Sequence, residues 1–168
     1  MPLSGDPDRP VEPGELDRLE SLVQDWVQLQ AAENPVVVAA ARDPERGTRR
    51  WMVRLAGDDK AQFTVWFDLR QRALHAETQL LPGPEEPPAP LYEYLLRANE
   101  ALRGVSVSIG PEDALYLRGE LPVEWLDGQH LDRLLGQLYE ATERLFRPAV
   151  RLAFGARFTP HPHPQPPN

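Results

Sequence analysis

Histidine side chains could do chemistry in this protein, as metal ligands or as proton carriers. There are four of them, His75, His130, His161 and His163. The last two stand one residue apart in a terminal segment rich in proline, where two ligands on a mobile chain would make only a weak metal site. The sequence contains no cysteine, which excludes thiol nucleophiles, disulfides and cysteine-ligated metals. We therefore predict no metal site and no cofactor.

Carboxylates occur in three adjacent pairs, which could supply an acid and a base. The pairs stand at positions 58–59, 85–86 and 112–113. All three fall in predicted turns or a proline-rich linker, whereas an acid–base pair needs a desolvated pocket that separates the two pKa values. Ser106 and Ser108 lie on the outward side of a predicted strand, without a histidine in a recognisable motif. Phosphate-loop, HExxH and GxSxG motifs are absent, so we predict no catalytic residues and a protein that is not an enzyme.

The charge balance argues against two kinds of partner. The formal net charge is -8 and the pI is about 5.0, and an acidic surface repels phosphate backbones. The one dense basic stretch, RGTRRWMVR at 46–54, is interpreted as a hairpin turn and a strand end. No apolar run approaches the roughly 20 residues of a membrane helix, and the first 15 residues lack the pattern of a secretory signal. We expect a cytoplasmic protein that binds neither nucleic acid nor membrane.

Apolar residues at spacings of three and four predict three helices. The first begins near Pro13, whose missing N–H costs nothing in a first turn, and ends before an Asn-Pro dipeptide. The second covers residues 91–103. The third starts after Asp127, the predicted N-cap, and stops at Gly155. We expect Pro148 to kink or restart this last helix.

Short runs of alternating apolar and polar residues predict strands between the helices. The predicted strands cover 51–55, 63–69, 74–79, 105–109 and 114–121, and the apolar run 36–41 is a further candidate. The first three form an antiparallel meander. This pattern indicates an α+β fold in the order α-β-β-β-α-β-β-α, with an antiparallel sheet of about five strands and helices packed on one face. We divide the chain into a disordered arm (1–12), a single domain (13–155) and a disordered Pro/His-rich tail (156–168).

The two faces of the predicted sheet differ in composition. The inward side collects the apolar residues of a core under the first and last helices, namely Val53, Leu55, Phe63, Val65, Phe67, Leu74, Val107, Leu115 and Leu117. A face exposed only to water would be plainly polar. The outward side instead carries Met52, Arg54, Trp66, Tyr116 and Arg118. Aromatic residues, Met and Arg are enriched in recognition surfaces, so this face either binds a partner or is covered by the linker and the tails.

The predicted helix at 91–103 has apolar residues on more than one side. Its main stripe consists of Leu91, Tyr94, Leu95, Ala98 and Leu102. Leu96 falls well off this stripe, and Asn99 lies on the flank toward Leu96. A helix of this kind is suited to burial on one face and docking on another. Asn99 could cap a loop carbonyl or fix the register of a docked partner by a buried hydrogen bond.

Three segments carry a resemblance to a known family. They are YEYLLRANEAL (92–102), IGPEDALYLRGELP (109–122) and LDGQHLDRLLGQL (126–138). With the order of elements, they resemble the YbjN family, within the type III secretion chaperone-like superfamily, over about residues 14–154. The resemblance implies a small α+β domain that often dimerises and binds extended or partly folded peptide. YbjN-like proteins have also been described as sensory-transduction regulators.

The resemblance also implies where the contacts lie. Type III secretion chaperones commonly pair through the middle helix and nearby strands, so Leu95, Leu96, Asn99 and Leu102 become the expected dimer contacts. The leading hypothesis is a non-enzymatic, chaperone-like homodimer that binds a client peptide or protein segment through the outward face of the sheet. The alternative is a signalling regulator that binds a small ligand or a partner protein.

Overall fold

The structure is a computed structural model that describes residues 10–155. In this part of the chain the helices are α1 (Pro13–Glu33), α2 (Ala89–Ala101) and α3 (Gly128–Phe154). The strands are β1 (Val37–Arg42), β2 (Arg50–Ala56), β3 (Gln62–Leu69), β4 (Ala73–Leu81), β5 (Val105–Ile109) and β6 (Leu115–Pro122). The single-turn 3-10 helices η1 (Pro111–Asp113) and η2 (Val123–Trp125) flank β6. Residues 1–9 of the predicted arm and the whole predicted tail, 156–168, lie outside the described residues.

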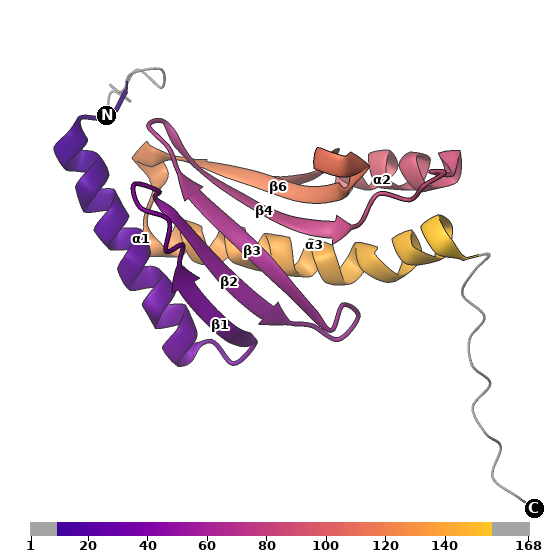
Figure 1. Ribbon diagram of the computed structural model, residues 1–168, viewed down its shortest axis with the longest axis horizontal. Helices are drawn as coiled ribbons and strands as arrows, with labels where there is room; N and C mark the ends of the chain where they lie inside the picture. The colour runs from indigo at the N-terminus through magenta and orange to yellow at the C-terminus, as the bar shows by residue number, and fades with distance from the viewer. Residues whose placement is uncertain (1–9, 156–168) are drawn as a thin grey trace, which may run out of the picture.

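The six strands between residues 10 and 155 form one antiparallel sheet in the order β1-β2-β3-β4-β6-β5 (Figure 1). The predicted meander is confirmed and begins one strand earlier, because the apolar run after α1 pairs with β2 as an edge strand. The order is therefore α-β-β-β-β-α-β-β-α, with six strands rather than about five. The predicted α+β class is confirmed.

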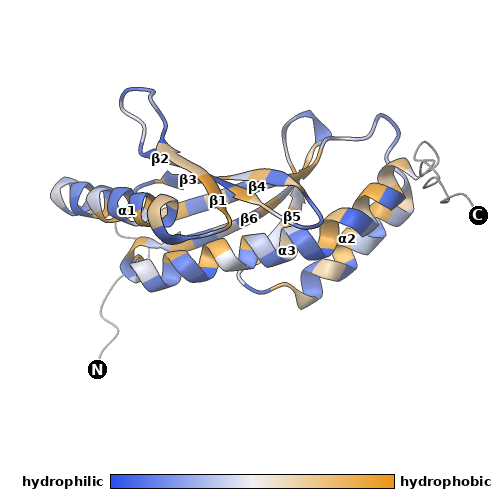
Figure 2. Cartoon of the chain, turned by 90° about the horizontal axis from the view of Figure 1, so that it is seen from below, coloured by the Kyte–Doolittle hydropathy of each residue, from blue (hydrophilic) through white to orange (hydrophobic). Residues whose placement is uncertain are grey.

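All three helices lie on the same side of the sheet (Figure 2). α1 packs against β1 and β2, while α3 crosses β4, β6 and β5. α2 packs against α3 and β5 at the far end of the sheet. The helices thus cover one face, as the amphipathic patterns predicted, and they leave the opposite face without a helix in the described part of the chain.

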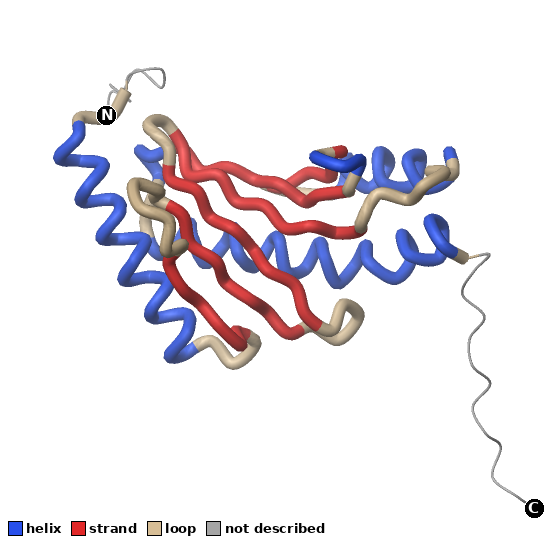
Figure 3. The backbone as a smooth tube through the Cα atoms, viewed as in Figure 1, coloured by secondary structure: helices blue, strands red, loops and turns tan. Residues whose placement is uncertain are grey.

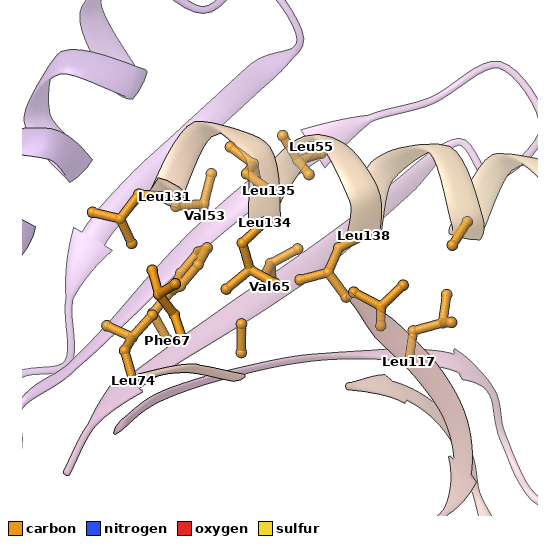
Figure 4. Packing of buried hydrophobic residues seen from close by; sticks show 14 of the residues in the cluster. Val53, Leu55, Val65, Phe67, Leu74, Leu117, Leu131, Leu134, Leu135 and Leu138 are labelled. Atoms are coloured by element: carbon orange, nitrogen blue, oxygen red, sulfur yellow. The ribbon is translucent and has the colours of Figure 1, made fainter. Parts of the chain in front are cut away.

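The core fills the space between the sheet and α3 (Figure 4). Leu131, Leu134, Leu135 and Leu138 point from α3 toward the strands. The largest sheet residues in this layer, Trp51 and Phe67, are completely buried. Burying side chains of this size stabilises a fold by roughly 1.5–3 kcal/mol each, so the helix-covered face holds most of the folding energy. Eight of the nine residues predicted to point inward are buried, the exception being Val107.

β5 departs from its predicted burial pattern. Val105 is buried, but Val107 is only half-buried and Ile109 is 54% exposed. β5 is an edge strand, and helical cover is complete only at its start, where Val105 and Leu134 of α3 both border Gly119 of β6. The alternation of apolar residues therefore marks one side of this strand correctly while overstating how deeply that side is covered.

α3 runs as one continuous helix through Pro148, so the helix does not restart at this residue, which was one of the two predicted alternatives. Proline removes one backbone hydrogen bond, at a cost of roughly 3 kcal/mol in a helix interior. The neighbouring Leu145 and Ala149 are fully buried and hold the adjacent turns against the sheet. The predicted N-cap is confirmed, because the carboxylate of Asp127 accepts a bond from the backbone N–H of His130 at 2.8 Å.

β3 and β4 pair along only part of their length. Their ladder ends at the pair Val65–Thr78, where the Thr78 hydroxyl donates to the carbonyl of Thr64 at 2.8 Å. Beyond this point β4 follows β6 through a bulge at Gln79–Leu81, and β3 stays with β2. Figure 3 shows the two strands side by side at one end and diverging at the other. The sheet therefore opens into two halves at this end.

Candidate functional site

The side of the sheet opposite the helices carries all five residues predicted to bind a partner. We call this side the open face and define it by Met52, Arg54, Trp66, Tyr116 and Arg118. Arg54 is exposed, and the other four are half-buried. They come from β2, β3 and β6, so the fold brings together residues that are more than 60 positions apart in the sequence.

The strand register places the central residues of the open face in a row. Met52 lies opposite Trp66, Trp66 opposite Glu77, and Glu77 opposite Arg118. The Arg118 guanidinium donates to the Glu77 carboxylate at 2.9 Å. The same guanidinium lies next to the Tyr116 ring.

Each aromatic ring of the open face lies beneath an arginine. The Arg50 guanidinium is 4.1 Å from the centre of the Trp66 ring, and the Arg118 guanidinium is 5.0 Å from the centre of the Tyr116 ring. Such cation–π contacts keep the rings oriented while leaving part of their surface to solvent. Our prediction from the sequence missed Arg50, although it shares the strand alternation of Met52 and Arg54 and could have been found from that period.

Two depressions lie on the open face. The larger, of about 590 Å³, is lined by Arg50, Trp66, His75, Glu77 and Arg118 among others. The smaller, of about 370 Å³, lies where β3 and β4 diverge and is lined by residues that include Lys60, Trp66 and Tyr116. Both are lined by charged and aromatic side chains together, a composition suited to a ligand with apolar and charged groups.

The proline-rich linker between β4 and α2 does not line either depression within residues 10–155. It turns toward η1 instead, since a Cβ added to Gly83 would lie 2.5 Å from the carbonyl oxygen of Glu112. The linker and the tails were the two segments considered from the sequence as covers of the open face. The linker lies at the end of the sheet instead. The two tails fall almost entirely outside the described residues.

The four residues expected at a dimer interface occupy different environments. Leu95 is 2% exposed and belongs to the core of its own chain, and Leu102 is half-buried. Leu96 points outward and is 69% exposed. The Asn99 side chain accepts from the backbone N–H of Val107 at 2.7 Å and donates to its carbonyl at 3.1 Å. Asn99 therefore pairs with β5 much as a neighbouring strand would, rather than capping a loop.

An apolar groove of about 360 Å³ runs between α2 and β5. Its lining includes Tyr92, Leu96, Val107 and Ile109, and it is almost free of polar surface. The incomplete cover of β5 and the outward position of Leu96 together create this groove. It is the second candidate contact surface of the molecule.

The other chemistry-bearing residues do not converge. The carboxylate pairs lie in the β2–β3 turn, the linker and η1, as predicted. The His75 Nδ1 atom lies 3.5 Å from the Glu120 carboxylate, and the His130 ring contacts the carboxylate of Asp127, the N-cap of α3. No cluster of three or more potential metal ligands occurs between residues 10 and 155, while His161 and His163 lie outside this range. Among the described helices, none has the length and apolar character needed to cross a bilayer.

The sequence matches the model of the YbjN family, described as "Putative bacterial sensory transduction regulator", over residues 29–150. This match covers most of the chain. The chain belongs to the YbjN family. Similar curated proteins are the uncharacterized protein ML2442 of Mycobacterium leprae (29% identity over 108 residues, 64% of this chain and 59% of the relative) and the uncharacterized protein Rv0487 of Mycobacterium tuberculosis (27% over 103 residues, 61% and 56%). The chain therefore matches less than two thirds of the length of these relatives.

Solved structures with the same fold include a chain from a type III secretion system and a chain from a chaperone–effector complex, in line with the predicted resemblance to type III secretion chaperones. A chain of the ExsC–ExsE complex aligns with a TM-score of 0.55 and 16% identity, over 77% of this chain and 94% of its own. A chain of the HopA1–SchA chaperone–effector complex aligns at 0.53 and 18%, over 83% and 99%. A chain of the ExoU–SpcU heterodimer of Pseudomonas aeruginosa aligns at 0.52 and 17%, over 75% and 98%. At these identities the likeness establishes the fold.

Proposed function

We propose that this protein is a non-enzymatic, chaperone-like module that holds an extended peptide or a segment of a client protein on the open face. The observation that carries the proposal is the open face itself. It has no helix and no linker across it in residues 10–155, and it presents Trp66 and Tyr116 beneath arginine guanidinium groups. The fold offers a precedent, since one of its structural relatives comes from a chaperone–effector complex.

The client would bind by two kinds of contact. Apolar side chains would pack against Trp66, Met52 and Tyr116, where half-buried rings already have their orientation fixed. Acidic groups would pair with Arg54, which is exposed and, among residues 10–155, makes only a long hydrogen bond of 3.5 Å to Thr64. Aromatic and arginine anchors of this kind typically contribute about 2 kcal/mol or more each to an interface.

The test is a pull-down from native cell extract with wild type and Trp66→Ala in parallel, read by mass spectrometry. Trp66→Ala is expected to weaken client binding by a factor on the order of 30, which corresponds to about 2 kcal/mol. Trp125→Ala is the matched control, because Trp125 is 60% exposed on η2, away from both depressions. Equal capture of the client by wild type and by a folded Trp66→Ala protein would show that the client does not bind the open face.

The same proposal includes a homodimer formed through the groove between α2 and β5. Leu96 and Ile109 are 69% and 54% exposed, and an apolar surface of this kind on both copies favours self-association. β5 is also an edge strand, which is able to extend the sheet into a second copy. Asn99 is already hydrogen-bonded to Val107, so its role in the dimer would be to hold β5 in place rather than to contact the second copy.

Light scattering tests the dimer. Leu96→Asp is expected to convert a dimer to a monomer at micromolar concentration, because it places a charge in the middle of the apolar contact. Leu29→Asp is the control, since Leu29 is an exposed leucine on α1, at the other end of the sheet. A wild-type protein that is already monomeric at this concentration would rule out the dimer.

A second candidate function is a signalling regulator that binds a small ligand, and the larger depression favours it. Its volume of about 590 Å³ lies within the usual range of small-molecule sites, roughly 300–1,000 Å³. Arg50, Arg70 and Arg118 at its wall suit a carboxylate or phosphate group that displaces their present acidic partners Asp43, Asp68 and Glu77. Thermal stabilisation by such a metabolite, lost in Arg50→Ala and with no protein co-purifying, would favour this function over client binding.

A further inference from the structure

Lys60, between β2 and β3, is the only lysine of the chain and lies in an unusual position. Its ammonium donates to two backbone carbonyls of β4, that of Gln79 at 2.5 Å and that of Leu80 at 3.0 Å. These carbonyls belong to the bulge at which β4 has left β3. The ammonium nitrogen also lies 5.3 Å from the centre of the Phe146 ring on α3.

The turn that carries Lys60 is fixed by α3. The Glu143 carboxylate accepts from the backbone N–H groups of Asp58, Asp59 and Lys60 at 2.7, 2.9 and 3.1 Å. Burial alone would raise the pKa of Glu143, but these three bonds lower it below its ordinary value. Arg147 adds an ion pair to Asp59 at 2.8 Å. Contacts with α3 therefore fix the backbone from which the Lys60 side chain extends.

The charged groups around Lys60 are engaged elsewhere. Glu143 bonds the backbone of the turn, Asp59 pairs with Arg147, and Glu77, which lines the same depression as Lys60, pairs with Arg118. Within residues 10–155 no carboxylate forms an ion pair with the Lys60 ammonium. Burial without a compensating anion disfavours the charged form and lowers the pKa of Lys60 to about 8.

We propose that Lys60 is a modification site, at which the neutral amine takes an acyl group from an activated donor, an acyl phosphate or a thioester. A neutral amine has two N–H bonds, which match the two carbonyl acceptors. Its lone pair is then left for an electrophile that arrives through the depression of about 370 Å³, which Lys60 lines with Trp66 and Tyr116. The fold thus holds a nucleophilic nitrogen in place without a catalytic base.

The step is an ordinary acyl transfer. The amine nitrogen attacks the acyl carbon and a C–N bond forms. The C–O bond of the acyl phosphate, or the C–S bond of the thioester, breaks as phosphate or thiolate leaves with the electron pair, and the nitrogen loses a proton to water. The resulting amide has one N–H and no charge, so either Gln79 or Leu80 loses its hydrogen-bond donor. The modification does not require a client, but a client seated on Trp66 and Tyr116 would cover the same depression.

The test uses full-length Arg103→Lys protein, which adds an ordinary exposed lysine as an internal reference. The folded protein is treated with acetyl phosphate at pH 7.5, and acetylation at each lysine is followed by mass spectrometry. Lys60 is expected to react on the order of tenfold faster, because its larger neutral fraction outweighs its lower basicity. Its rate should level off above about pH 8, while that of the introduced lysine continues to rise. In urea the two rates should become equal.

Acetyl coenzyme A in place of acetyl phosphate distinguishes the two donor classes. Faster reaction of Lys60 than of the introduced lysine with either donor supports the site and assigns its donor. A Lys60 that reacts no faster than the introduced lysine with both donors would overturn the proposal. So would a rate at Lys60 that rises up to pH 10 like that of the exposed lysine.

Discussion

Phe67 and Trp66 are neighbours on β3, and they show how differently the two faces of one sheet are built. Phe67 points toward the helices, is completely buried and meets the Trp26 ring edge-on at 5.3 Å. Trp66 points to the open face, where one side of its ring lies under the Arg50 guanidinium. The helix-covered face packs apolar side chains against one another, whereas the open face stacks its rings under charged groups. Residues of the first kind hold the fold together, and those of the second kind remain accessible to a partner.

The largest effect is expected for Phe67→Ala. Removing a buried phenylalanine leaves a cavity and typically costs about 3–5 kcal/mol of unfolding free energy. Urea denaturation followed by circular dichroism measures this loss. The adjacent Trp66→Ala is expected to cost less, about 1–2 kcal/mol, since its ring is only partly buried and its removal leaves no enclosed cavity. Similar losses for the two variants would mean that the open face is buried in the native protein.

The next largest effect is expected for Glu143→Ala. It removes three hydrogen bonds to a carboxylate at the β2–β3 turn and should cost about 2 kcal/mol at pH 7. Because the pKa of Glu143 is lowered in the folded state, its contribution is full above its ordinary pKa of 4.5 and is lost as the pH falls through the lower folded value. Urea denaturation at pH 7 and at pH 3 should therefore show a smaller difference between wild type and variant in acid. A difference independent of pH would exclude the carboxylate as its source.

A smaller effect is expected for Asn99→Ala, at about 1–2 kcal/mol. It leaves the N–H and carbonyl of Val107 without their side-chain partner on an edge strand that has few other contacts. Hydrogen exchange should show faster exchange at the Val107 amide. Glu100→Ala, an exposed residue of the same helix, is the control and should change stability by less than about 0.5 kcal/mol. Unchanged exchange at Val107 would contradict the role of Asn99 in holding β5.

The smallest effect on stability is expected for Arg118→Ala. Its ion pair with Glu77 lies on the open face, where partly exposed pairs contribute about 0–1 kcal/mol. The same variant should reduce client binding, because the Arg118 guanidinium lies over the Tyr116 ring on the open face and keeps it oriented. Thermal denaturation and client capture measured together separate the two effects. A large loss of stability would show that this face supports the fold as well.

Much of the fold could be predicted because burial leaves a periodic record in the sequence. The alternation in β2 and β3 identified Val53, Val65 and Phe67 as inward, and all three are buried. Pro148 misled the prediction of a restarted helix, because the cost of one proline is local and the turns beside it are packed in the core. Ile109 misled it for the opposite reason, since alternation identifies a side of a strand but cannot show how far a helix covers that side.

The candidate site was predictable in part. The outward alternation identified five residues of the open face, and the structure places all five on one side of the sheet. The stacking of Arg50 on Trp66 depends on the register between β2 and β3, which the sequence does not specify. Lys60 was visible only as a solitary lysine, because its contacts with Gln79 and Leu80 arise from the divergence of β3 and β4. Contacts of this kind are set by tertiary structure and leave no local pattern.

The central claim is that the open face binds the client, and calorimetric titration tests it most directly. A segment of a client recovered with the wild-type protein would be titrated into wild type, Trp66→Ala and Trp125→Ala. The account predicts a dissociation constant raised on the order of 30-fold by Trp66→Ala and changed less than about twofold by Trp125→Ala. Equal affinity of wild type and folded Trp66→Ala would contradict it.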